Sequence, residues 1–138
     1  MGSRRKAREA ALQVLYQLDG SEFDADTALD LYRASFGDDL GDTDFAVALV
    51  RGYYGARERV DTAIREVSRH WRLERMARVD RNIIRLATYE LLDLPEIPHR
   101  ATLNEAVELA KRFGDENSPA FVNGVLDRIA ESAGRGAG

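Results

Sequence analysis

A group of cationic side chains lies along one flank of the first predicted helix, over residues 3–18. At about 100° per residue, Arg4, Arg5 and Arg8 fall together, and Tyr16 falls on the same flank as Arg5. They border a stripe of apolar side chains at helical spacing that is predicted to be buried, namely Ala7, Ala10, Ala11, Val14, Leu15 and Leu18. Guanidinium groups in line with an aromatic ring suit the neutralisation of phosphates and the stacking of bases, as in the binding of single-stranded RNA. A solvated helix start is an equally good interpretation of these residues alone.

The charges are unevenly distributed along the chain. Its 138 residues carry a formal net charge of −4, and this length favours a single domain. Residues 19–44 hold nine carboxylates against Arg33 alone, whereas residues 51–85 hold ten arginines against five acids. This asymmetry predicts surface regions of opposite sign, which are a basis for oriented binding of RNA or protein.

Several classes of chemistry lack the residues that they need. The chain has no cysteine, which excludes disulfides and thiol nucleophiles and fits a reducing, cytoplasmic setting. His70 and His99 have no third nitrogen or sulfur ligand, so no zinc site is expected. No glycine-rich phosphate loop is present, and no stretch approaches the about 18 apolar residues of a membrane span. The sequence indicates a binding module with no metal and no cofactor, and not an enzyme.

The periodicity of nearly every segment is that of a helix, and no alternating strand pattern occurs. Helices are predicted over about 3–18, 25–36 and 79–93, and Asp24 is the predicted cap of the second. The apolar pattern over 45–71 fits either one long helix or two helices broken near Gly52–Gly55. The predicted fold class is therefore all-α.

Two further helix starts are predicted towards the end of the chain. The capping-box spacing of Thr102 and Glu105 predicts a helix that begins there and ends at Gly114. The last helix is expected to have Asn117 or Ser118 as its cap, with Pro119 in its first turn.

Three side chains stand out within the predicted helices. Glu90 projects into an apolar stripe, so it must be hydrogen-bonded or paired, and a structural role is favoured, such as tying down the loop between Pro95 and Pro98. Phe121 is displaced from the stripe of the last helix and is either an aromatic at the edge of the core or an exposed stacking platform. Asp80 stands at the start of its helix, where a carboxylate interacts favourably with the helix dipole.

Two adjacent segments at the end of the chain resemble the C-terminal signature of the bacterial NusB family. They are Asn104–Gly114 (NEAVELAKRFG) and Ser118–Ile129 (SPAFVNGVLDRI). Arg4–Tyr16 and Val79–Leu91 agree with the same family in order and spacing. The resemblance therefore spans nearly the whole chain.

The resemblance implies a compact seven-helix bundle with two helical subdomains, about 1–70 and 71–133, followed by a flexible tail at 134–138. It implies a transcription antitermination factor that binds boxA RNA together with NusE, a small-subunit ribosomal protein, within the antitermination complex of RNA polymerase. The family's RNA-binding positions fall on Arg4, Arg5, Lys6, Arg8, Asn117, Ser118 and Phe121. Its NusE-facing positions fall on Tyr16, Glu74 and Asp80.

The chain departs from the family pattern at two positions, Asn117 and Ser68. Relatives often carry an acid at the position of Asn117, so a neutral side chain here removes one repulsion against phosphate. Ser68 stands near a place where some relatives carry a ring that stacks on RNA; Trp71 or Tyr53 is a candidate substitute, and loss of that contact is the alternative.

Other interpretations remain open at this point. The chain is alternatively an accessory domain associated with an RNA methyltransferase, or a helical scaffold without an RNA role. Some NusB-type proteins are homodimers that hide the RNA surface, and the sequence does not decide between monomer and homodimer. The leading interpretation expects the flank of the first helix and the start of the last to form one groove that joins Arg5, Arg8 and Phe121.

Overall fold

Residues 2–134 are described by the structure, which is a computed structural model. They form seven α-helices and one 3₁₀ turn and contain no β-strand, which confirms the all-α prediction. The elements are α1 (Gly2–Leu18), α2 (Ala25–Phe36), α3 (Thr43–Gly55), α4 (Arg57–Val67), η1 (Leu73–Arg75), α5 (Arg78–Asp93), α6 (His99–Phe113) and α7 (Ser118–Ser132). Of the predicted tail 134–138, all but Gly134 lies outside the described residues. Within 2–134, no helix is both long and apolar enough to cross a bilayer.

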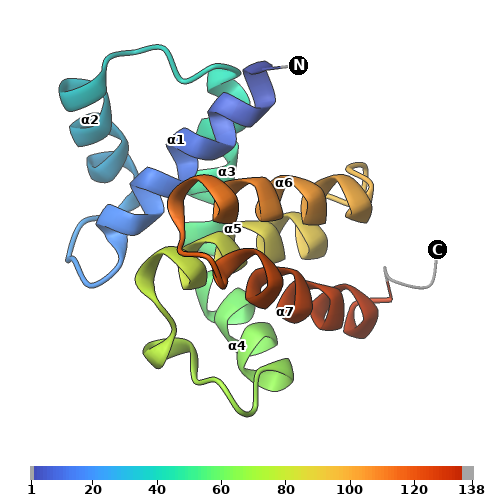
Figure 1. Ribbon diagram of the computed structural model, residues 1–138. Helices are drawn as coiled ribbons and strands as arrows, with labels where there is room; N and C mark the ends of the chain where they lie inside the picture. The colour runs from blue at the N-terminus through green and yellow to red at the C-terminus, as the bar shows by residue number, and fades with distance from the viewer. Residues whose placement is uncertain (1, 135–138) are drawn as a thin grey trace.

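α5 is the central helix of the bundle. It packs against α1, α3, α4, α6 and α7, and Figure 1 shows it behind α6 in the middle of the molecule. Because neighbours cover it on several sides, α5 buries polar side chains as well as apolar ones, including Asn82, Thr88 and Glu90. The helices that carry the candidate site residues are therefore held in place through α5.

Short-range sequence signals explain most of the helix boundaries. The Asp24 carboxylate accepts a hydrogen bond from the Thr27 backbone N–H at 2.8 Å, which confirms the predicted cap of α2. The pattern over 45–71 forms two helices, and the break falls at Gly55 and Ala56. Gly52 stays inside α3, where a Cβ atom would collide with the ring of Tyr89. That glycine allows α3 to approach α5 closely.

The predicted start of α6 is wrong by three residues. α6 begins at His99, directly after Pro98, and not at the capping-box spacing of Thr102 and Glu105. Thr102 is buried, and its hydroxyl donates to Glu90 Oε1 at 3.0 Å, so it serves packing between helices and not capping. Proline, which sets its own φ near the helical value, is tolerated at a helix start without a side-chain cap.

Candidate nucleic-acid interface

The cations at the start of α1 lie on the surface, and each faces a carboxylate. Arg5 donates two hydrogen bonds to Glu105, at 3.0 and 2.8 Å. Lys6 donates to Asp39 at 2.7 Å, and Arg4 lies 4.0 Å from Asp42, with side chains that are about half exposed. These cations are already neutralised within the chain.

These carboxylates respond to the cations opposite them. The hydrogen bond from Arg5 lowers the pKa of the Glu105 carboxyl, against the opposing effect of burial. The hydrogen bond from Lys6 likewise lowers the pKa of Asp39. Exposed pairs of this kind are weak, because water screens both charges, so a phosphate can replace the carboxylate at small cost.

Arg8 lies near Arg4, since both guanidiniums lie over the Phe45 ring, but it is not part of the exposed cluster, which corrects the prediction that its guanidinium faces a phosphate. It is only 5% exposed, and its guanidinium donates to both oxygens of Glu90, at 2.9 and 2.8 Å. The prediction that Glu90 needs a partner is confirmed, although its partners are Arg8 and Thr102 and not the Pro95–Pro98 loop. An unpaired carboxylate at this depth would be very costly, so the arginine is drawn inward.

One surface hollow, of about 660 Å³, joins the start of α1 to α6 and α7. We call it the Arg5 hollow, and its lining includes Arg5, Glu105, Lys111, Pro119, Ala120 and Asn123. Arg5 and Lys111 supply the cations, and Glu105 and Glu108 supply neighbouring carboxylates. The opposing charges leave this hollow without a strong net attraction for an anion.

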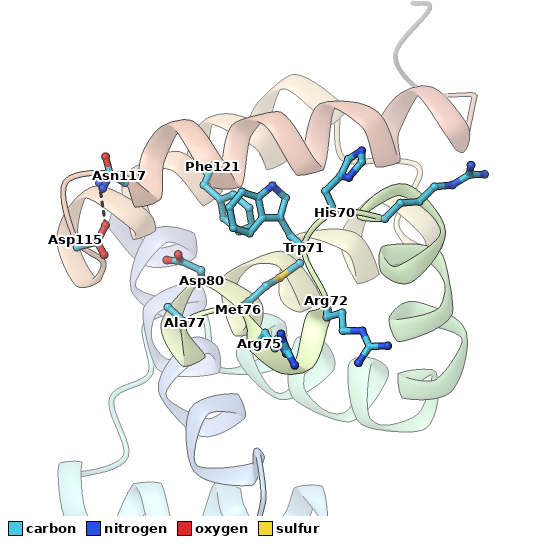
Figure 2. Close-up of a pocket in the computed structure, with 11 residues that line it drawn as sticks. His70, Trp71, Arg72, Arg75, Met76, Ala77, Asp80, Asp115, Asn117 and Phe121 are labelled. Atoms are coloured by element: carbon cyan, nitrogen blue, oxygen red, sulfur yellow. Dashed lines mark hydrogen bonds between the residues drawn. The ribbon is translucent and has the colours of Figure 1, made fainter.

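A second hollow, of about 780 Å³, lies on the other side of the first turn of α7. We call it the Trp71 hollow, and its lining includes Arg72, Arg75, Asp80, Asn117, Phe121 and Trp71. The Trp71 and Phe121 rings meet edge to face, with centroids 5.9 Å apart, and Figure 2 shows both rings at the α7 side of the hollow. Trp71 is 63% exposed, so most of its surface is open to a ligand.

The expected single groove is therefore absent from the described residues. Arg8 is buried, and Arg5 and Phe121 line two different hollows. The reason is the geometry of α7: Ala120 and Phe121 are consecutive residues, so their side chains leave the helix about 100° apart. A strand that reached both hollows would have to cross the first turn of α7.

Asn117 and Ser118 differ in what they offer a ligand. Asn117 is exposed at the rim of the Trp71 hollow. Ser118 is only 1% exposed, and its hydroxyl accepts a hydrogen bond from the Asp115 backbone N–H at 3.0 Å. A Cβ atom on Gly114 would collide with Ser118. Ser118 was expected to be an RNA-binding residue, but its buried side chain closes the tight turn between α6 and α7 and does not face a ligand.

Tyr16, Glu74 and Asp80 surround the start of α5. The guanidinium of Arg78 covers the Tyr16 ring at 4.2 Å and donates to the Tyr16 backbone carbonyl at 2.6 Å. Glu74 is exposed. Its carboxyl accepts a hydrogen bond from its own backbone N–H and another from Arg65, and both lower the pKa of that carboxyl. Asp80 is 8% exposed and lines the Trp71 hollow, and its Oδ1 has no hydrogen-bond partner among residues 2–134.

The family of the chain follows from comparison with known proteins. A model of the NusB family matches residues 5–131. This chain belongs to the NusB family. The transcription antitermination protein NusB of Sorangium cellulosum (strain So ce56) is 51% identical over 136 residues, which cover 98% of this chain and 96% of that protein. The family is one of transcription antitermination factors and not of enzymes.

Solved structures agree with this membership. T. maritima NusB superposes with a TM-score of 0.82 at 40% identity, and the match covers 93% of this chain and 90% of that chain. A crystal structure of the antitermination factors NusB and NusE in complex with dsRNA matches with a TM-score of 0.85 at 28% identity, covering 96% and 98% of the two chains.

For this NusB-family chain, sequence reasoning missed the arginines beside the exposed ring. Arg69, Arg72 and Arg75 line the Trp71 hollow, but none was singled out, because the segment has no helical period that would assign it a face. The available signal was the concentration of arginine around the only tryptophan. Of the two candidate rings, Trp71 is exposed and Tyr53 is buried, and Ser68 itself is also buried.

Proposed function

We propose that this NusB-family chain binds boxA-type RNA together with NusE and so supports antitermination by RNA polymerase in the cytoplasm. The observation that carries this proposal is the Trp71–Phe121 ring pair in an open hollow at the start of α7. Exposed rings beside arginines are how proteins hold the unstacked bases of single-stranded RNA. The crystal structure of a related NusB with NusE and dsRNA supports both partner classes.

The proposed RNA contacts fall into two groups. Phe121 and Asn117 lie at the Trp71 hollow, and Arg4, Arg5 and Lys6 lie at the start of α1. The α1 cations would exchange their carboxylates for phosphates, which costs little at exposed pairs. Arg8 and Ser118 act as positioning residues: Arg8 holds α1 against α5, and Ser118 shapes the turn that presents Asn117.

The proposed NusE contacts are Tyr16, Glu74 and Asp80. Their position around the start of α5 supports one continuous contact area, because Arg78 bridges from α5 to the end of α1. The free Oδ1 of Asp80 is an acceptor without a donor, and a buried polar atom of this kind is stabilised when a binding partner supplies one. A backbone N–H or a cationic side chain of a partner protein would be such a donor.

A gel-shift titration tests the proposed function. We expect a boxA oligonucleotide to bind the chain, to bind more tightly with NusE present, and to bind more tightly than a scrambled oligonucleotide of equal length. Phe121→Ala should weaken boxA binding roughly tenfold, the typical loss of one base-stacking contact. Phe23→Ala is the matched control, since Phe23 is an exposed phenylalanine that lines neither hollow. No shift and no NusE complex would favour the scaffold interpretation instead.

The methyltransferase-associated alternative has less support. The 51% identical relative is matched over 96% of its own length and is a transcription antitermination protein. An accessory role would predict binding to a methyltransferase that survives removal of NusE, which a pull-down with both candidate partners distinguishes.

A further inference from the structure

The segment 69–75 gathers three arginines that have no hydrogen-bonded or ion-paired partner within residues 2–134, whereas the other arginines of this kind, Arg33, Arg100 and Arg128, stand singly in the chain. Arg69, Arg72 and Arg75 are exposed, and within residues 2–134 none donates a side-chain hydrogen bond or forms an ion pair. Arg4, Arg5 and Lys6, by contrast, each face a carboxylate. An unpaired guanidinium attracts a phosphate without first giving up a carboxylate.

The carboxylates near this segment cancel only part of its charge. Glu74 pairs with Arg65, with the nearest atoms 2.6 Å apart, and the charge of Arg72 acts on it as well. Asp80 and Asp115 also line the Trp71 hollow, but Figure 2 shows Asp115 on the side opposite His70 and Arg72. One rim of the hollow is therefore cationic, and the other carries the acids.

The cationic rim and an exposed ring come from the same segment of the chain. Arg72 and Arg75 stand three residues apart at the two ends of the η1 turn, where side chains three residues apart leave on the same side. Figure 2 shows both pointing out of the hollow in a similar direction, whereas the Trp71 ring from the same segment reaches towards Phe121 and α7. The Trp71 ring packs edge to face with Phe121 and is still 63% exposed. Proteins that bind single-stranded nucleic acid commonly place cations along the phosphate backbone and an aromatic ring nearby, on which a base stacks.

We propose that the segment from Arg69 to Arg75, together with Phe121, is the main RNA-binding strip of this chain. A base stacks on Trp71, and the neighbouring phosphates pair with Arg69, Arg72 and Arg75, while the cations of α1 contribute less. This inference rests on the proposed function, because it takes RNA as the ligand. It assigns the phosphate contacts to Arg69, Arg72 and Arg75, which are outside the expected family positions, and it places the principal stacking contact on Trp71.

The single tryptophan of the chain makes the stacking contact directly measurable. Titration with boxA RNA should quench the Trp71 fluorescence in step with the gel shift. Trp71→Phe should bind within about twofold of the unchanged chain, because a ring remains, and Trp71→Ala should bind roughly tenfold more weakly. Subtracting the Trp71→Phe signal removes any emission from NusE. Saturating RNA that leaves the emission unchanged would overturn the stacking contact.

The salt dependence of affinity tests the phosphate contacts. For single strands, each phosphate contact contributes roughly 0.7 to the slope of log affinity against log salt. Arg72→Gln with Arg75→Gln should therefore lower the slope by about 1.4. The matched control is Arg100→Gln with Arg128→Gln, which removes the same charge from two exposed arginines that lie outside the Trp71 hollow and have no paired carboxylate within residues 2–134. Arg4→Gln with Arg5→Gln should lower the slope by less than the Arg72 and Arg75 pair does.

The outcomes separate this inference from the proposed function. If the unchanged chain fails to bind boxA RNA even with NusE, the proposed function fails. If it binds but the Arg72 and Arg75 variant keeps the full slope, or the control pair loses as much, only the strip is wrong. Loss of NusE binding by that variant, with RNA affinity of the chain alone unchanged, would make the strip a protein interface and overturn the inference.

Discussion

Arg5 and Arg8 show how the same amino acid at neighbouring positions on one helix takes different roles. Arg5 meets Glu105 at the surface, whereas Arg8 meets Glu90 in the core. What separates them is the position of the carboxylate: Glu90 is only 2% exposed, and burying a carboxylate without a cation is costly. Arg8 also lies over the Phe45 ring at 5.1 Å, which covers its apolar face.

The buried pair predicts a large loss of stability for one substitution. Arg8→Met should lower the free energy of unfolding by about 3–5 kcal/mol, because Glu90 is left in the core without a cation. Adding Glu90→Leu should recover part of that loss, since a well-packed apolar pair replaces a buried ion pair at little cost. Urea denaturation followed by circular dichroism measures both. Arg5→Met is the control and should leave the unfolding midpoint nearly unchanged; a midpoint equally unaffected by Arg8→Met would show that the buried pair is unimportant.

At the scale of elements, Asp19 fastens the end of α1 to α5. Its Oδ2 accepts hydrogen bonds from Arg81 at 2.6 Å and from Asn82 at 2.9 Å, and it lies 3.2 Å from Arg85. Arg85 in turn pairs with Asp61 of α4. Burial acts to raise the pKa of the Asp19 carboxyl, but the hydrogen bonds from Arg81 and Asn82 and the nearby cations lower it overall.

This lowered pKa predicts a pH-dependent contribution to stability. Because the folded pKa of Asp19 lies below its unfolded value of about 4, the stabilisation is fully present above that value and is lost as the pH falls through the folded pKa. Asp19→Asn should therefore be less stable by about 2 kcal/mol at pH 7, and the gap should shrink below about pH 4. Urea unfolding of both proteins between pH 7 and pH 3 measures the gap. A gap that stays constant or widens in acid would contradict the assignment.

Local signals predicted the elements well, and tertiary contacts decided the exceptions. The Asp24 cap and the periodicity of α5 needed only nearby residues, so the sequence was sufficient there. Thr102 resembled a helix cap, but its hydroxyl donates a hydrogen bond to Glu90, twelve residues earlier in the chain.

The division into two subdomains near residue 70 stays a prediction. Because α4 packs on α5 and α7, we propose that the boundary lies between α3 and α4.

Across the whole molecule, the charge asymmetry of the sequence becomes a spatial one. The acidic stretch 19–44 includes α2, at one end of the molecule in Figure 1, and the segment 69–75 follows α4 near the other end. Opposite potentials at two ends orient an approaching polyanion towards the cationic end. The sequence predicted this asymmetry, but it did not predict which arginines stay unpaired, because that depends on which carboxylates the fold brings near them.

Photo-crosslinking tests the central claim, that the RNA strand lies on the Trp71 side of α7. A boxA oligonucleotide carrying 4-thiouridine is crosslinked to the chain in the presence of NusE, and the modified peptides are mapped by mass spectrometry, with scrambled RNA as competitor. We predict crosslinks within residues 69–75 and at Phe121, and we expect the yield of these crosslinks to stay the same when scrambled RNA is added as competitor. Crosslinks confined to residues 4–6 and to the Arg5 hollow, with none at Trp71 or Phe121, would contradict the account.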